Sequence, residues 1–356
     1  MLKLLELSEK SHASDLHILP DSPPLLRIHG VLAPIKDSTI LSASDTQQLL
    51  YSVLSEDQQQ ALEKNLVIEI ALHIPNIGSF RVSIFHQAKG IAAVFRIIPK
   101  TIPSFEQLEA PETIKKLLGL SQGLILVTGP TGSGKSTTLA AMLDYINSFR
   151  GCHIVTIEDP IEFTFENKRS IFNQMQVGRD TPDFATALRA SLRQDPNVIM
   201  LSELRDLETM RLALTAAETG HLVMATLHAS SAPLAINRFA DVFPHEEKNR
   251  VRTLLGETLQ AVICQSLVKK ISGGRVAAFE IMLTTPPIRH YIQQDMPANM
   301  ESTMQTNGDK GMCTLEQYLQ TLVKKGLITP LTASTTIANQ KAYKEIAKRT
   351  DRTTKK

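Results

Sequence analysis

The chain has 356 residues, which is enough for two or three domains that each bury a hydrophobic core. Hydrophobic residues make up 42% and charged residues 21%, proportions that are ordinary for a globular protein in water. The 38 Lys and Arg residues nearly balance the 36 Asp and Glu residues, so the net charge of +2 excludes the strongly basic field that favours nucleic-acid binding.

The three cysteines, Cys152, Cys264 and Cys313, are far apart and have no CxxC spacing. This indicates reduced thiols in a cytosol and excludes a four-cysteine zinc site within one chain. No apolar run reaches the length of a membrane span, and Glu6 interrupts the segment where a signal peptide would be apolar. We therefore expect a soluble, cytoplasmic protein without a transmembrane segment, with a solvated basic tail at residues 348–356.

Residues 1–99 are expected to form a small α+β domain. Helical periodicity covers residues 2–12 and 44–64, and alternating or apolar runs predict strands at 15–19, 25–33 (a hairpin), 66–74, 79–85 and 91–98. Residues 100–117 carry prolines and acidic residues, which is typical of an interdomain linker.

Residues 118–285 alternate apolar runs with helical stretches, which predicts a parallel sheet with crossover helices and an overall α/β fold. The expected strands are 124–127, 153–157, 198–201, 222–227 and 276–282, and the expected helices are 135–149, 184–194, 207–219 and 234–269, the last broken near Pro244. Residues 286–356 show a helical pattern. Open α/β sheets bind ligands at the carboxyl ends of their strands, so the polar residues that follow each strand are candidate site residues.

A phosphate-binding loop, Gly129-x-x-x-x-Gly134-Lys135-Ser136, joins the first strand and helix of this domain. Glycines let backbone N–H groups approach phosphates, Lys135 supplies positive charge for the β- and γ-phosphates, and the Ser136 hydroxyl completes a Mg²⁺ shell. A chance match in a glycine-rich turn is the alternative, and the flanking strand and helix disfavour it. The expected nucleotide-binding residues are Gly129, Pro130, Thr131, Gly132, Ser133, Gly134, Lys135, Ser136 and Thr137.

A carboxylate, Glu203, follows the expected strand 198–201. It could hold the Mg²⁺ shell or a water, or it could simply pair with Arg205. His228 ends the next strand along the chain. Its imidazole could sense the γ-phosphate, or it could be the satisfied partner of a backbone carbonyl.

Three acidic residues, Glu158, Asp159 and Glu162, crowd the end of the expected strand 153–157. Such acids repel one another unless they face a cation or water, so the crowding points to a charged ligand nearby. One of them could orient the water that attacks a γ-phosphate. The alternative is a solvated acidic loop.

Taken together, these segments resemble the secretion ATPases, and most closely the retraction ATPases of type IV pili. The resemblance implies a PAS-like N-terminal domain, a RecA-like ATPase domain that binds ATP and Mg²⁺, and a homohexamer at the cytoplasmic face of the inner membrane, docked to a pilus or secretion platform protein. It also implies that Glu162 is the catalytic glutamate and Glu203 the Walker B glutamate. The residues that carry the resemblance are 129–137 (Walker A), 156–162 (Asp box), 195–206 (Walker B) and 219–228 (His box), with 13–17, 80–82, 94–96 and 188–193 outside them.

Four arginines gain a possible role from the same resemblance. Arg81 and Arg96 match the arginines that the N-terminal domain brings to the nucleotide, where a guanidinium neutralises the charge of the transferring phosphoryl group. The residues alone favour the simpler interpretation of charges on a strand surface. Arg189 and Arg193 are spaced i, i+4 on one helical face and could contact phosphate or a neighbouring subunit.

The chain departs from the family pattern at three places. Ser202 stands where the family has Gly beside the Walker B glutamate, and Ala225 replaces another Gly-type position. Residues 287–292 keep only Ile288, Arg289 and Ile292 of a stretch that is typical of retraction ATPases.

The leading hypothesis is therefore a Mg²⁺-ATP-hydrolysing hexameric motor that drives pilus retraction and twitching motility. The altered residues 287–292 favour an alternative, the motor ATPase of a type IV secretion system. A RecA-like DNA motor conflicts with the near-neutral charge and the lack of an aromatic stacking stripe, so no stable nucleic-acid partner is expected. A GTPase would need an Asn-Lys-x-Asp guanine reader, and residues 167–170 lack the Asp.

Overall fold

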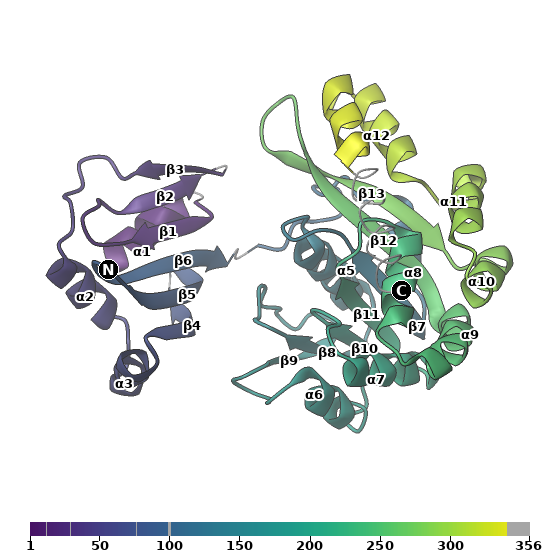
Figure 1. The fold of residues 1–356 in the computed structure, drawn as a ribbon, viewed down its shortest axis with the longest axis horizontal. Coiled ribbons are helices and arrows are strands. Elements are labelled where there is room, and N and C mark those ends of the chain that lie inside the picture. The colour runs from purple at the N-terminus through teal and green to yellow at the C-terminus, as the bar shows by residue number, and fades with distance from the viewer. Residues whose placement is uncertain (12, 29, 76, 99–100, 340–356) are drawn as a thin grey trace. The chain divides into compact units, whose positions relative to one another are not determined.

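The computed structural model describes residues 1–11, 13–28, 30–75, 77–98 and 101–339, so the expected basic tail at 348–356 lies outside the described residues. The chain divides into two compact units, Met1–Thr101 and Ile102–Lys356 (Figure 1). Each unit has its own sheet and its own buried core. Within these described ranges, no helix combines the length and the apolar character that crossing a bilayer requires.

The first unit is an antiparallel sheet with three helices. Its strands follow the order β3-β2-β1-β6-β5-β4. The single helix expected at residues 44–64 is two helices, because Ser42 and Ser55 each form a capping box that starts a new helix. The elements are α1 (Leu2–Lys10), β1 (Asp15–Ile18), β2 (Leu25–Ile28), β3 (Val31–Pro34), α2 (Ala43–Tyr51), α3 (Glu56–Asn65), β4 (Val67–Ile74), β5 (Gly78–Gln87) and β6 (Gly90–Ile98).

The second unit is built on a seven-stranded sheet of order β13-β12-β7-β11-β10-β8-β9, in which β12 and β13 are antiparallel and the other pairs are parallel. A further helical stretch covers residues 330–339. The elements up to that point are α4 (Glu112–Leu117), β7 (Gly123–Thr128), α5 (Lys135–Phe149), β8 (His153–Glu158), β9 (Ile171–Gln176), α6 (Phe184–Ser191), β10 (Val198–Leu201), α7 (Leu207–Glu218), β11 (Leu222–Leu227), α8 (Ala232–Asp241), η1 (His245–Glu247), α9 (Lys248–Thr258), β12 (Leu259–Lys269), β13 (Arg275–Leu283), α10 (Pro286–Gln293), α11 (Pro297–Thr306), η2 (Gly308–Lys310) and α12 (Leu315–Lys324).

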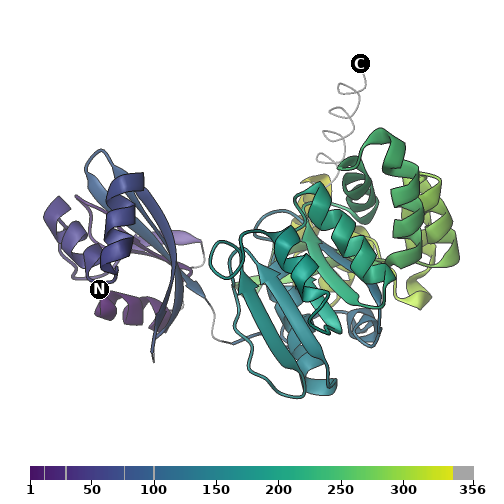
Figure 2. The same ribbon diagram turned by 90° about the horizontal axis from the view of Figure 1, so that it is seen from below.

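Both faces of this second sheet are covered by helices (Figures 1 and 2). Along β7, Leu124 and Leu126 belong to the core beneath α6–α11, whereas Ile125 and Val127 belong to the core beneath α4 and α5. Because side chains alternate along a strand, a strand that is buried on both faces shows a continuous apolar run. This explains why residues 124–127 predicted a strand so clearly.

Three features of the second unit differ from the expectations. Residues 259–269, expected at the end of a helix, form β12, which lies between β7 and β13 and is buried on both sides. A short apolar run of this kind does not distinguish a buried strand from a buried helix. Strand β9 was not expected, and residues 102–117, the expected linker, contribute α4 and the buried Phe105 to this unit.

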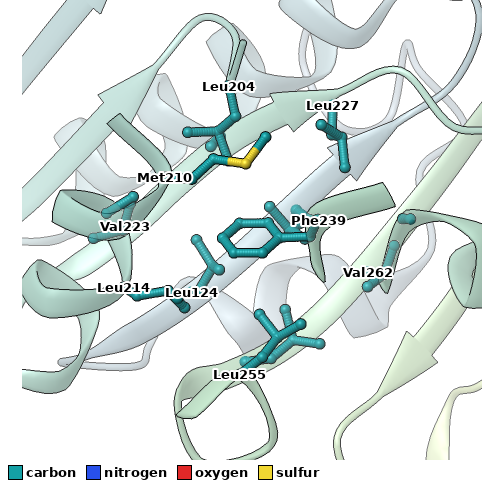
Figure 3. Close-up of a cluster of buried hydrophobic side chains, with 14 of the residues drawn as sticks. Leu124, Leu204, Met210, Leu214, Val223, Leu227, Phe239, Leu255 and Val262 are labelled. Carbon is teal, nitrogen blue, oxygen red and sulfur yellow. The ribbon is translucent and has the colours of Figure 1, made fainter. Parts of the chain in front are cut away.

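The larger core of the second unit surrounds Phe239. Figure 3 shows its ring among Leu124, Met210, Leu255 and Val262. These residues come from β7, α7, α9 and β12, and Phe239 itself from α8. The ring therefore joins the helical layer to the centre of the sheet.

Replacing Phe239 with Ala should lower the free energy of unfolding of this unit by about 3–5 kcal/mol, because the cavity cannot fully collapse. Phe149, whose side chain is 62% exposed, is the matched control, and Phe149→Ala should change stability by less than about 1 kcal/mol. Urea unfolding followed by fluorescence of a dye bound to the second unit measures both. Equal effects at the two positions would contradict this packing.

Candidate active site

The four sequence motifs meet at one edge of the second sheet because its central strands are parallel and in register. Thr128 at the end of β7 lies opposite Leu227 of β11, and Leu201 at the end of β10 lies opposite Ala225 of β11 and Ile157 of β8. The phosphate-binding loop, His228, Ser202-Glu203 and the loop after Glu158 therefore leave the sheet at the same end of its strands.

The Lys135 ammonium lies inside the phosphate-binding loop. Its Nζ donates hydrogen bonds of 3.0 Å to the carbonyl oxygens of both Gly129 and Pro130. Burial lowers the pKa of Lys135, and the nearby carboxylates of Glu203 and Glu162 act in the opposite direction. Both glutamates thus lie within electrostatic reach of the ammonium.

A buried amide that the sequence reasoning missed supports the loop from the neighbouring strand. Gln265 of β12 is 2% exposed; its Nε2 donates to the carbonyl of Ser133 at 2.8 Å, and its Oε1 accepts from the Thr138 hydroxyl at 2.7 Å. A Cβ on Gly129 would come within 2.3 Å of the Gln265 carbonyl oxygen, so this approach requires glycine. The available signal was a lone amide within the largely apolar run 261–268.

The Glu203 carboxylate lies between the side chains of Arg205 and His228. One carboxylate oxygen is 2.8 Å from a guanidinium nitrogen of Arg205, and the other is 3.1 Å from His228 Nε2. The expected alternative of a pair with Arg205 is therefore present, together with a contact to the His box. The partner of the His228 ring is this carboxylate and not the backbone carbonyl that was the alternative.

The three crowded acids occupy three different environments. Glu158 is buried and accepts hydrogen bonds from the Thr156 hydroxyl at 2.6 Å and from Gln174 Nε2 at 3.0 Å, and burial raises its pKa. Asp159 is 3.3 Å from Arg205. Glu162 is exposed. The hydrogen bonds to Glu158 and the ion pair of Asp159 offset their mutual repulsion, and the exposed side chain of Glu162 is open to a ligand or water.

Ser202, which stands where the family has Gly, makes a hydrogen bond through its side chain. Its hydroxyl accepts a hydrogen bond of 3.1 Å from the backbone N–H of Asp159, and its carbonyl accepts one from the Thr226 hydroxyl. A glycine could form only the second of these bonds. Ala225 is fully buried in the core, where a methyl group fits.

Arg81 and Arg96 lie in the first unit. Asp15 of β1 stands opposite both Arg27 and Arg96, and Arg96 stands opposite Arg81, so the four side chains share one face of the sheet. Arg96 Nε is 3.0 Å from Asp15, and an Arg81 guanidinium nitrogen is 3.0 Å from Glu69. These pairs match the simpler interpretation of strand-surface charges.

Arg189 and Arg193, the other two arginines, differ in their contacts. Arg189 of α6 forms an ion pair with Glu208 of α7, whereas Arg193 is exposed just beyond the end of α6. The structure therefore gives Arg189 a partner within the same unit.

The residues of the loop fit a nucleotide with Mg²⁺. The Ser133 hydroxyl is 3% exposed, and within the described part of the chain it has no hydrogen-bond partner. Of the three N–H donors of Lys135, the two carbonyl bonds use two, which leaves one donor for a phosphate oxygen. The first turn of α5 follows at once and adds its N–H groups and partial positive charge.

Comparison with known proteins places the whole chain in one family. A family model described as "Type II/IV secretion system protein" matches residues 3–355. The chain is 50% identical over 327 residues to the "Type IV pilus retractation ATPase PilT" of Pseudomonas aeruginosa, covering 92% of this chain and 95% of that protein. It is 45% identical over 331 residues to a "Twitching motility protein" of Neisseria gonorrhoeae, covering 93% and 88%.

The fold agrees with this similarity. A crystal structure of the pilus retraction motor PilT with bound ADP superposes with a TM-score of 0.88 at 45% identity, covering 94% of this chain and 96% of that one. The chain therefore has the α/β fold of these ATPases, and the family resemblance indicated by the four motifs is confirmed.

Replacing Gln265 with Met, which keeps the side-chain length and removes both hydrogen bonds of the amide, should weaken ATP binding about 30-fold, because the two lost hydrogen bonds contribute about 1 kcal/mol each. Titration with a fluorescent ATP analogue measures this. Gln260→Met is the matched control, since Gln260 lies on the same strand beside Gly123, at the opposite end of β7 from the loop. Unchanged affinity in Gln265→Met would contradict a supporting role.

Proposed function

The chain belongs to the family of type II/IV secretion system proteins and is an ATPase, and from this premise we propose that it is a Mg²⁺-ATP-driven motor that retracts type IV pili. One observation supports this most: the phosphate-binding loop, Glu162, Glu203 and His228 converge at one sheet edge in a chain that is similar to PilT over nearly its full length. In the proposal the motor is a homohexamer at the cytoplasmic face of the inner membrane, docked to a platform protein.

In the proposed mechanism the loop residues 129–137 bind the phosphates, and Lys135 neutralises their charge. The Ser136 hydroxyl and Glu203 would hold Mg²⁺, which would supply Lewis-acid stabilisation of the transferring phosphoryl group. The exposed Glu162 orients the attacking water. His228, which contacts Glu203, links the state of the nucleotide to β11.

We also propose that residues 1–99 form the PAS-like domain, 118–285 the RecA-like core and 286–356 a helical extension, with 100–117 connecting the first two. In a hexamer Arg81 and Arg96 would exchange Glu69 and Asp15 for phosphate oxygens. Their position on one sheet face supports such a joint movement. Hydrolysis would then occur only when the domain delivers both guanidiniums, which ties turnover to domain rotation.

A secretion-system motor is the second candidate, and α10 is the observation that favours it. Ile288 and Ile292, which this chain shares with retraction ATPases, are fully buried, whereas the altered position His290 is exposed. The two fully buried positions are thus preserved, whereas the exposed His290 and the partly buried Tyr291, which packs against the core, differ, as expected if the exposed part of this helix docks to a different machine.

The site assignment is tested by two variants of the purified chain. Lys135→Ala should lose nucleotide binding and hydrolysis, because the only ammonium inside the loop is removed. Glu162→Gln should bind ATP with unchanged affinity but lose most turnover, by about 100-fold or more, because an amide cannot accept a proton from the attacking water. Phosphate release and binding of a fluorescent ATP analogue are measured on the sized oligomer.

Persistent hydrolysis in Glu162→Gln would remove this residue from its role. A chain that stays monomeric and cannot hydrolyse ATP would overturn the motor itself.

An experiment in cells distinguishes a pilus retraction motor from a secretion-system motor. Deleting the gene from a piliated strain should abolish twitching and leave pili extended, and Glu162→Gln should fail to restore it, because retraction requires turnover. Time-lapse microscopy of labelled pili is the measurement. Normal twitching together with a loss of protein secretion would favour the secretion motor instead.

A further inference from the structure

The loop that carries Glu162 is fastened to β9 by amide side chains. Gln174 Nε2 donates to the Phe163 carbonyl at 2.9 Å and to Glu158 at 3.0 Å, while Gln174 Oε1 accepts from the Phe165 N–H at 3.1 Å. Gln176, two residues on and on the same strand face, accepts from the Ile161 N–H at 3.3 Å. The Gln174 amide thus binds backbone groups on the C-terminal side of Glu162. The Gln176 amide binds the backbone of Ile161, the residue just before Glu162.

We propose that Gln174 is a positioning residue for Glu162, which acts on turnover by fixing the backbone from which this carboxylate projects. The inference rests on the proposed function, in which Glu162 orients the attacking water. Among the residues that the structure describes, the Gln174 amide bonds to Phe163, Phe165 and Glu158 and not to the Glu162 carboxylate or the phosphate-binding loop, so its effect passes through the loop backbone.

The surroundings of Glu162 explain why such fixing is needed. Glu162 is exposed, so packing does not restrain it. Its neighbours are restrained: Phe163 is 6% exposed, and the Phe165 ring stacks on Phe172 of β9 with centroids 4.4 Å apart. Gln174 bonds to the backbone of both phenylalanines, so it sets the path of the chain between two side-chain anchors.

The buried carboxylate of Glu158 requires the residue at 174 to be a donor. Glu158 accepts from Thr156, from Gln174 and from the backbone N–H of Glu162 itself. The Gln174 amide can donate to this carboxylate and accept from Phe165 at the same time, because it carries both kinds of group. A carboxylate at 174 would place a second negative charge beside Glu158.

Gln174→Met, which keeps the length but removes the amide, should lower kcat by about 10- to 100-fold, since small displacements of a reacting group have effects of this size. The KM for ATP and the affinity for a fluorescent ATP analogue should stay within about twofold. Asn173→Ala is the matched control, because Asn173 is an exposed amide on the opposite face of the same strand, and its kcat should be unchanged.

A double variant tests whether the effect passes through Glu162. In a Glu162→Asp background, where the carboxylate is already displaced, Gln174→Met should lower kcat less than it does in the parent chain, because two changes that act through one group are not additive. Fully additive losses, an unchanged kcat in Gln174→Met, or a loss of ATP affinity would each overturn the proposal.

If Gln174→Met does not fold, Gln174→Asn, which withdraws the amide by one methylene, replaces it with the same expected outcome. The result also separates this inference from the proposed function. Full turnover in Glu162→Gln contradicts the function assigned to Glu162, whereas full turnover in Gln174→Met with an inactive Glu162→Gln contradicts only the role of Gln174.

Discussion

The site depends on keeping one ammonium group charged while it is buried. Lys135 is 9% exposed, and removal from water disfavours its charged form. Two backbone carbonyls and the nearby carboxylates of Glu203 and Glu162 compensate. The carbonyls are reachable only because the loop is tightly folded against Gln265, and the carboxylates only because the parallel strands β7, β11, β10 and β8 end on the same side of the sheet. The buried Lys135 ammonium therefore interacts electrostatically with carboxylates from two other motifs, Glu203 and Glu162.

Environment assigns different tasks to chemically similar side chains. Glu158 is buried and hydrogen-bonded, Glu203 is held between Arg205 and His228, and Glu162 is exposed. In the proposed function this difference in surroundings lets the same functional group serve structure at Glu158, metal binding at Glu203 and water orientation at Glu162. In the first unit, the guanidiniums of Arg81 and Arg96 are likewise assigned to carboxylate partners, Glu69 and Asp15.

Much of the fold was predictable because its signals are local. The strand of residues 124–127 and the helix that starts at Lys135 follow from an apolar run, a glycine turn and helical periodicity. The pattern failed at residues 259–269, where a buried strand and a buried helix have the same apolar composition, and at 44–64, where capping boxes at Ser42 and Ser55 divide the helix. Strand β9 escaped notice because it is an edge strand with three amide residues, two of which, Gln174 and Gln176, form hydrogen bonds to a loop.

The sequence by itself determined the phosphate-binding loop and the identity of the candidate acids, because glycine, lysine and carboxylate chemistry at fixed spacing is a local property. It could not determine their partners. That Gln265 supports the loop, that Gln174 fastens the segment around Glu162, and that Glu203 contacts His228 were decided only by the tertiary structure. Each of these contacts joins residues from different strands or loops, and the order of strands in a sheet, which no local pattern encodes, decides which side chains meet.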